Sequence, residues 1–162
     1  MRQFYDYIHR IREDPADSGP DESHILKSTF DIRKSDSDKM QAFGWASVSI
    51  DETGEQLEDW QEDMIDPEEL EQAAYEFVLH YGDGGEMHEP SGRIVAKLIE
   101  SMVFTEEKQK LLGIPAGTLP IGWWIGFQVT DPEVWEKVKN GTYSMFSIEG
   151  KAERVQIEEE DI

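Results

Sequence analysis

The chain of 162 residues contains no cysteine, which excludes a disulfide scaffold, a thiolate zinc site and a cysteine nucleophile. It also lacks any apolar run close to the roughly 20 residues that a membrane-spanning helix requires. The first residues, MRQFYDYIHRIRED, contain no apolar core of the kind found in signal peptides. We therefore expect a soluble, intracellular protein with no membrane partner.

Basic residues are scarce. Lysine and arginine number 15 against 36 aspartates and glutamates, which gives a net charge of −21, and residues 40–92 contain no lysine or arginine at all. Such a surface repels nucleic-acid phosphates instead of displacing their counterions, so we expect no nucleic-acid partner. An acidic DNA mimic that occupies a nucleic-acid-binding protein is a third-ranked hypothesis, because a charge run is usually a solvated face.

Motifs for metals, phosphates and common hydrolases are absent. Gly150-Lys151 is not a phosphate-binding loop, because Ala152 stands where that loop needs serine or threonine. No histidine pair has the spacing of a zinc helix, and Asp36 and Asp38 lack the glycine and the closing glutamate of a calcium loop. No serine lies in a G-x-S-x-G elbow. We expect neither a metal nor a cofactor.

Composition divides the chain into three parts. Residues 1–23 are rich in polar residues, proline and glycine towards their end, and we expect a weakly ordered N-terminal arm. Residues 24–157 carry nearly all the apolar periodicity and are expected to form one domain. Residues 158–162 form a short acidic tail.

Hydrophobic periodicity predicts strands at 25–32, 42–50, 94–104, 121–130 and 142–157, and helices at 66–81 and 131–138. Residues 105–113 are predicted to be a helical turn or a loop insertion. Gly82–Gly85 is expected to end the first helix, and Gly122 and Gly126 to mark a bend of the kind found at barrel corners. The order of elements predicts an α+β fold that is mainly β, with a bent, barrel-like sheet flanked by a few helices.

Among the four histidines, His88 is the strongest candidate for chemistry. His9 and His24 lie in or beside the arm, and His80 lies near a helix end, where the dipole favours a cation. His88 lies on a loop that leads into the strand at Ile94, and functional residues concentrate on loops held by rigid elements. A surface histidine without a role is the alternative.

Two serines and one glutamate complete the candidates. Ser144 and Ser147 lie in YSMFSIEG on the last predicted strand. Each is either a small residue on a strand face of mixed polarity or a candidate nucleophile. Because they are three residues apart, they point to opposite faces of a regular strand, so only one of them can meet His88. Glu100 interrupts an apolar strand and lies either on a solvated face or beside a partner inside the protein.

At this point the sequence resembles a known family, the phage prohead (capsid maturation) proteases, in particular the phage serine proteases of the XkdF type. The resemblance covers roughly residues 25–155 and is most specific from Gly117 to Gly150. It depends on five blocks in the same order: GWASVSID, MIDPEELEQAAYEFV, MHEPSGRIVAKLIES, GIPAGTLPIGWWIGFQVTDPEVWEKVKNG and YSMFSIEGKAERV.

The resemblance implies a fold similar to herpesvirus assembly proteases, a bent β-barrel with surrounding helices, and serine endopeptidase activity. The family's histidine corresponds to His88, its nucleophile to Ser147, and the acidic residue of its E-S strand to Glu100. In that arrangement the imidazole accepts the serine proton and the carboxylate fixes the imidazole tautomer. Glu149 is the alternative third member, and a bare Ser-His dyad is a further one.

The resemblance also implies partners and a location. The substrates would be the phage scaffold and major capsid proteins, and the protein would act in the host cytoplasm, inside the procapsid. Herpesvirus relatives act as dimers, which leaves a homodimer open, although no interface stripe is visible in this sequence.

Three residues near Ser147 bear on activity. Met145 stands where many members have glycine, two residues before the serine, and would alter how closely a substrate backbone approaches. Glu149 shares a strand face with Ser147 and would repel a developing oxyanion, whereas Arg154 would help to hold one. These departures favour an alternative function, a catalytically inactive capsid-assembly factor with the same fold.

Overall fold

The structure, a computed structural model, describes residues 30–36, 39–58, 64–86, 92–146 and 148. The predicted arm at 1–23 and the predicted tail at 158–162 lie outside these residues. Of the predicted last strand at 142–157, only 142–146 and 148 are described.

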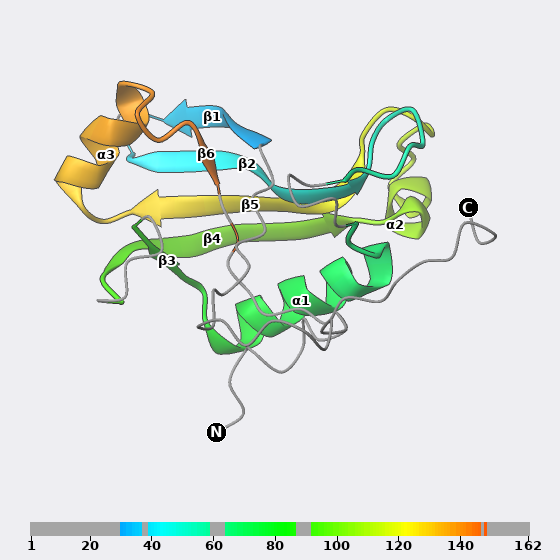
Figure 1. The fold of residues 1–162 in the computed structure, drawn as a ribbon, viewed down its shortest axis with the longest axis horizontal. Helices are drawn as coiled ribbons and strands as arrows, with labels where there is room; N and C mark the ends of the chain where they lie inside the picture. The colour runs from blue at the N-terminus through cyan, green and yellow to red at the C-terminus, as the bar shows by residue number, and fades with distance from the viewer. Residues whose placement is uncertain (1–29, 37–38, 59–63, 87–91, 147, 149–162) are drawn as a thin grey trace, which may run out of the picture.

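An antiparallel sheet forms the body of the described chain (Figure 1). Its strands lie in the order β3-β4-β5-β2-β1-β6. In chain order they are β1 (Phe30–Asp36), β2 (Gln41–Ile50), β3 (Asp83–Gly85), β4 (Ile94–Phe104), β5 (Ile121–Val129) and β6 (Met145–Phe146).

The two central strands are covered on both faces. Residues 44–49 of β2 are all buried, and β5 is buried over most of its length. Sequence alternation predicted at least one buried face for β2, and the second face is covered as well because Ser47 and Ser49 are small enough to be enclosed. The predicted strands at 42–50, 94–104 and 121–130 are confirmed.

The glycines of β5 allow close approach between neighbouring strands. A Cβ on Gly126 would lie 2.5 Å from the ring of Phe43, and one on Gly122 would lie 2.6 Å from the carbonyl oxygen of Ser47. The pairing of β2 with β5 also shifts register between Trp45 and Ser47. These glycines, predicted to mark a bend, thus make room for the adjacent strand and its side chains.

Helix α1 (Pro67–His80) begins as its sequence predicts. The Asp66 side chain accepts a hydrogen bond from the Glu68 backbone N–H over 2.8 Å, and proline occupies the first turn. The helix packs across β2, β4 and β5, and the ring of Phe77 contacts that of Trp123 at 5.5 Å between centroids. Its buried residues are Leu70, Ala73 and Ala74.

The glycine-rich segment after α1 is more than a helix stop. Gly82 has a φ of +65°, which ends the helix, but the next three residues pair with β4 as the edge strand β3. Gly84 lies so close to β4 that a Cβ would be 3.0 Å from the Cβ of Ala96. The prediction of Gly82–Gly85 as a simple stop was therefore incomplete.

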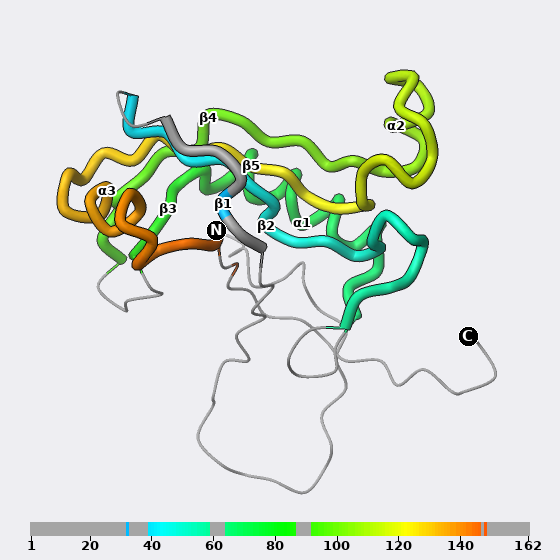
Figure 2. Tube along the Cα trace, turned by 90° about the horizontal axis from the view of Figure 1, so that it is seen from above, coloured from blue at the N-terminus to red at the C-terminus, as the bar shows by residue number. Residues whose placement is uncertain are grey.

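Two short helices lie at opposite ends of the sheet (Figures 1 and 2). Helix α2 (Glu106–Leu111) is capped by Thr105, and α3 (Pro132–Lys139) is capped by Asp131, whose side chain accepts from two backbone N–H groups. The predicted second helix is confirmed, and the segment 105–113 contains a true helical turn.

The sheet curls until its last strand returns over its middle (Figure 1). Phe146 of β6 packs on Phe127 of β5, with ring centroids 5.7 Å apart. A Cβ on Gly84 of β3 would lie 3.3 Å from the same Phe127 ring. One aromatic side chain of the central strand thus lies against both edge strands. The mainly β, barrel-like α+β fold predicted from the sequence is confirmed.

Candidate functional site

The residues predicted to perform catalysis fall at the margins of the described chain. Ser147, His88 and the alternative acid Glu149 lie outside the described residues, whereas Glu100 and Ser144 lie within them. The structure describes the chain on both sides of the serine and on both sides of the histidine. Those flanking segments therefore define where the site lies.

The segment that carries the serine is fixed to the core. Phe146 and Ile148, its two neighbours, both pack against the main hydrophobic cluster between the sheet and α1. Phe146 and Met145 also pair with β1. Ser144 lies at the start of this segment, exposed, and its carbonyl oxygen accepts a hydrogen bond from the Ile32 N–H over 2.6 Å.

The segment that carries the histidine is held at both ends by the opposite edge of the sheet. Before it, β3 leads directly into Glu86, whose side chain is only 7% exposed. After it, Gly92 and Arg93 lead into β4. A buried glutamate is unusual unless it is paired, because burial removes the hydration of its charge.

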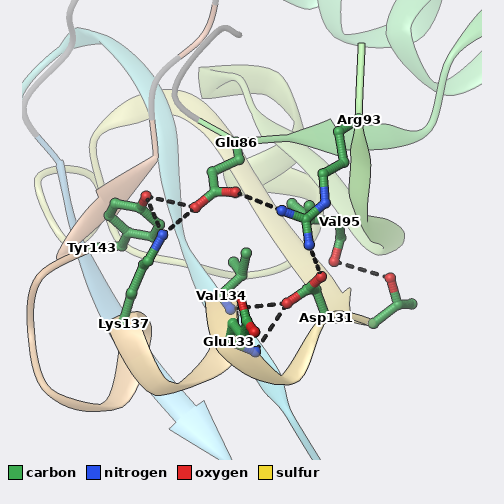
Figure 3. A network of polar contacts seen from close by, with 9 residues as sticks. Glu86, Arg93, Val95, Asp131, Glu133, Val134, Lys137 and Tyr143 are labelled. Atoms are coloured by element: carbon green, nitrogen blue, oxygen red, sulfur yellow. Dashed lines mark hydrogen bonds and ion pairs between the residues drawn. The ribbon is translucent and has the colours of Figure 1, made fainter. Parts of the chain in front are cut away.

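Glu86 is paired with three donors (Figure 3). Its Oε1 accepts from Lys137 Nζ at 2.5 Å and from the Tyr143 hydroxyl at 2.8 Å, and its Oε2 accepts from Arg93 Nη1 at 3.3 Å. Arg93 also forms an ion pair with Asp131, the cap of α3. We call these five residues, Glu86, Arg93, Asp131, Lys137 and Tyr143, the Glu86 network.

The donors of the network favour the charged form of each acid. The hydrogen bond from Lys137, followed by that from Tyr143, holds the pKa of Glu86 below its ordinary value. The same bond to Glu86 raises the pKa of Lys137. Backbone donation from Val134 is the largest cause that lowers the pKa of Asp131. The contacts therefore favour the charged forms of Glu86, Asp131 and Lys137.

The network joins the two segments that flank the predicted site. Glu86 directly follows β3, at one edge of the sheet, and Tyr143 lies two residues before β6, at the other edge. Their hydrogen bond therefore links the two edges. Glu86, two residues before His88, and Tyr143, four residues before Ser147, lie side by side.

Glu100 lies on the other face of the sheet from α1. Its Oε1 accepts a hydrogen bond from Trp124 Nε1 over 2.9 Å, and Trp124 packs edge-on against Trp45. The adjacent Trp123 points the opposite way, into the cluster beside α1. The sequence left open whether Glu100 lay on a solvated face or beside a partner inside the protein. The solvated face is confirmed, since the side chain is exposed and its hydrogen bond to the Trp124 indole lies at the surface.

The remaining described histidine has a local partner. His80 Nε2 lies 3.1 Å from Glu76 Oε2, one helical turn earlier on α1, and its side chain is exposed. This agrees with the prediction that His80 has a structural role at the end of the helix and no catalytic one. His9 and His24 lie outside the described residues.

Sequence reasoning missed Glu86 as a site residue. It is one of 36 acidic residues, and its partners Lys137 and Tyr143 are 51 and 57 positions away. The one available signal was its place directly after Gly84-Gly85 and directly before the MHEPSGRIVAKLIES block, and that signal does not identify its partners.

Two further features concern metals and membranes. Within the described ranges, no group of three histidine, aspartate or glutamate side chains is arranged to hold a metal ion. Among those same residues, no helix has both the length and the apolar character needed to cross a bilayer.

Comparison with known proteins gives one family. The family described as "Putative phage serine protease XkdF" matches residues 29–156, which is well over half of the chain. No match was found among curated proteins or among solved structures, so the similarity to herpesvirus assembly proteases stays a prediction. With the family match spanning β1 to β6, the chain belongs to the XkdF family of phage serine proteases.

Proposed function

We propose that this protein is a serine endopeptidase of phage capsid maturation that cleaves scaffold or major capsid protein inside the procapsid. Ser147 is the nucleophile and His88 the general base. The third member is Glu100 or Glu149, and Glu100 could serve only if the site reaches the sheet face opposite the cluster on which the neighbours of Ser147 pack. The substrate, the site residues and the location are proposals that follow from membership of the family.

The observation that supports this proposal best is the hydrogen bond between Tyr143 and Glu86. His88 is two residues from Glu86 and Ser147 is four residues from Tyr143. Because a chain spans at most about 3.6 Å per residue, these positions can lie no farther than roughly 7 Å and 14 Å from the two bonded residues along the backbone. That reach is compatible with contact between a serine hydroxyl and an imidazole.

The chemistry requires little beyond this pair. The His88 imidazole removes the proton of the Ser147 hydroxyl as the oxygen attacks the peptide carbonyl, and it then donates that proton to the departing amine. Water hydrolyses the resulting acyl-enzyme with the same base. A carboxylate behind the imidazole stabilises the imidazolium, which is the role proposed for Glu100, with Glu149 as the alternative.

The direct test uses the purified chain with its phage scaffold and major capsid proteins. We expect cleavage by the wild type and by Ser144→Ala, and none by Ser147→Ala or His88→Ala. A fluorophosphonate probe should label the wild type and fail to label Ser147→Ala. Equal cleavage by the wild type and Ser147→Ala would contradict the proposal.

A second function is favoured by Met145. Its side chain is 44% exposed directly before Phe146 and the serine position, where many relatives have glycine. A side chain there obstructs a substrate backbone, which favours an inactive capsid-assembly factor. If the protein has that function, neither the wild type nor the Ser147→Ala and His88→Ala variants would cleave the capsid proteins. The protein would still be needed for capsids of normal size and shape.

A further inference from the structure

We propose that Glu86 and Tyr143 are positioning residues, whose hydrogen bond joins the segment that leads into His88 to the segment that leads into Ser147. This inference rests on the proposed function, because it concerns the same serine and histidine. Neither residue is proposed to touch substrate.

Among the described residues, no backbone ladder joins β3 to β6, which are the two ends of the strand order. In the described chain their junction consists of side chains: the hydrogen bond from Tyr143 to Glu86 and the shared contact of both edges with Phe127. Loss of the bond would therefore loosen the two edges relative to each other while leaving every strand pair intact.

Glu86 is enclosed, and both its carboxylate oxygens already accept hydrogen bonds from Lys137, Tyr143 and Arg93. A carboxylate occupied in this way holds its surroundings in place and has little capacity left to orient an imidazole as well. Its role is thus distinct from the role proposed for Glu100.

The hydrogen bond between Tyr143 and Glu86 is supported from α3. Tyr143 is fixed by its backbone N–H, which donates to the Lys137 carbonyl oxygen over 3.0 Å, and by Lys137 Nζ, which lies 5.2 Å from the centre of its ring. On the other side, Arg93 connects Glu86 to the α3 cap, Asp131. The residues of α3 therefore fix the position of Tyr143, two residues before β6 begins.

The chain contains a matched control. Tyr75 of α1 donates from its hydroxyl to Glu71 over 2.6 Å, and Lys108 Nζ lies 5.1 Å from the centre of its ring and binds the same glutamate. This second tyrosine–glutamate–lysine set joins α1 to α2 and not the two sheet edges. Tyr75→Phe removes the same hydroxyl as Tyr143→Phe in a similar local setting.

The first experiment measures cleavage of a scaffold-derived peptide. Tyr143→Phe is expected to lower kcat by about tenfold or more with KM changed by less than about twofold, because misplacing reacting groups by an ångström costs rate more than binding. Glu86→Gln is expected to act in the same direction. Tyr75→Phe is expected to leave both constants unchanged, and an equal loss in both tyrosine variants would overturn the inference.

The second experiment does not depend on proteolysis. Because the chain has no cysteine, a variant with His88→Cys and Ser147→Cys carries a single pair of thiols, and its rate of disulfide formation reports how often the two positions meet. We expect rapid formation in this background, a rate at least about fivefold lower when Tyr143→Phe is added, and no change with Tyr75→Phe.

The outcomes separate the two proposals. If Ser147→Ala cleaves like the wild type, the proposed function fails, while cross-linking still reports on positioning. If the thiol pair does not cross-link, or cross-links equally with and without the Tyr143 hydroxyl, the positioning role fails whatever the cleavage assay shows. Should Glu86→Gln not fold, Tyr143→Phe, which removes one oxygen atom, carries the test.

Discussion

Gly122 of β5 lies directly against the backbone of Ser47 in β2, so close that a Cβ on the glycine would be 2.6 Å from the serine carbonyl oxygen. Backbone atoms of a paired strand cannot move aside as a flexible side chain can. We therefore predict that Gly122→Ala forces the central strands apart and lowers the free energy of unfolding by about 1–3 kcal/mol, measured by urea denaturation.

The control for this prediction is another strand glycine. A Cβ on Gly85 of β3 would meet only the Arg93 carbonyl oxygen, at 3.8 Å, which is ordinary contact. Gly85→Ala should therefore change stability by less than about 0.5 kcal/mol. Similar losses in the two variants would show that close approach at Gly122 is not the cause.

The N-cap of α1 offers a second prediction. Asp66 accepts from the Glu68 N–H, so Asp66→Ala leaves a helix donor without its partner and should cost about 1 kcal/mol of stability. Asp66→Asn keeps an acceptor oxygen at the same place and should cost much less. Thermal unfolding of the two variants followed by circular dichroism checks this order, and equal melting temperatures would contradict it.

Ser49 gives a prediction of opposite sign. Its side chain is fully enclosed in β2, and its hydroxyl has no hydrogen-bond partner among the described residues. Because an unsatisfied buried hydroxyl is costly, Ser49→Ala should leave stability unchanged or raise it by up to about 1 kcal/mol. Ser101→Ala is the contrast, since Ser101 Oγ accepts from Trp123 Nε1, and its loss should destabilise the fold.

The pH dependence of stability should contain a contribution from Glu86. Its pKa lies below the ordinary value of 4.5 in the folded state, so its stabilisation is fully present above that value and is lost as pH falls through the folded pKa. Lys137 has a pKa above 10.5 and stays charged throughout this range. The stability difference between the wild type and Glu86→Gln should therefore be constant from about pH 7 to 5 and shrink towards pH 3, as followed by urea unfolding.

Local signals predicted much of the fold. The Asp66-Pro67 and Asp131-Pro132 pairs marked the starts of α1 and α3, because a cap acts through groups only two or three residues away. The long strand at 94–104 was clear from its apolar, branched composition. By contrast, β3 was missed because three residues rich in glycine have no strand pattern, and they are held in the sheet by their pairing with β4.

The site was predictable only in part. Family resemblance directed attention to His88 and Ser147, and the structure describes their flanking residues. Glu86 could not be selected by sequence reasoning, since its function depends on donors from α3 and from the segment before β6. Long-range pairing of this kind follows from the tertiary fold, and no local periodicity encodes it.

The contact between β3 and β6, made in the described part of the chain by side chains and not by a ladder, has an evolutionary consequence. Every residue type except proline carries the amide groups that join paired strands, so single mutations seldom break such a joint. A phenol and a carboxylate, by contrast, can be lost or regained through one codon change at position 143 or 86. We expect family members to have gained and lost activity by substitutions at positions 86 and 143 while their sheets stayed intact.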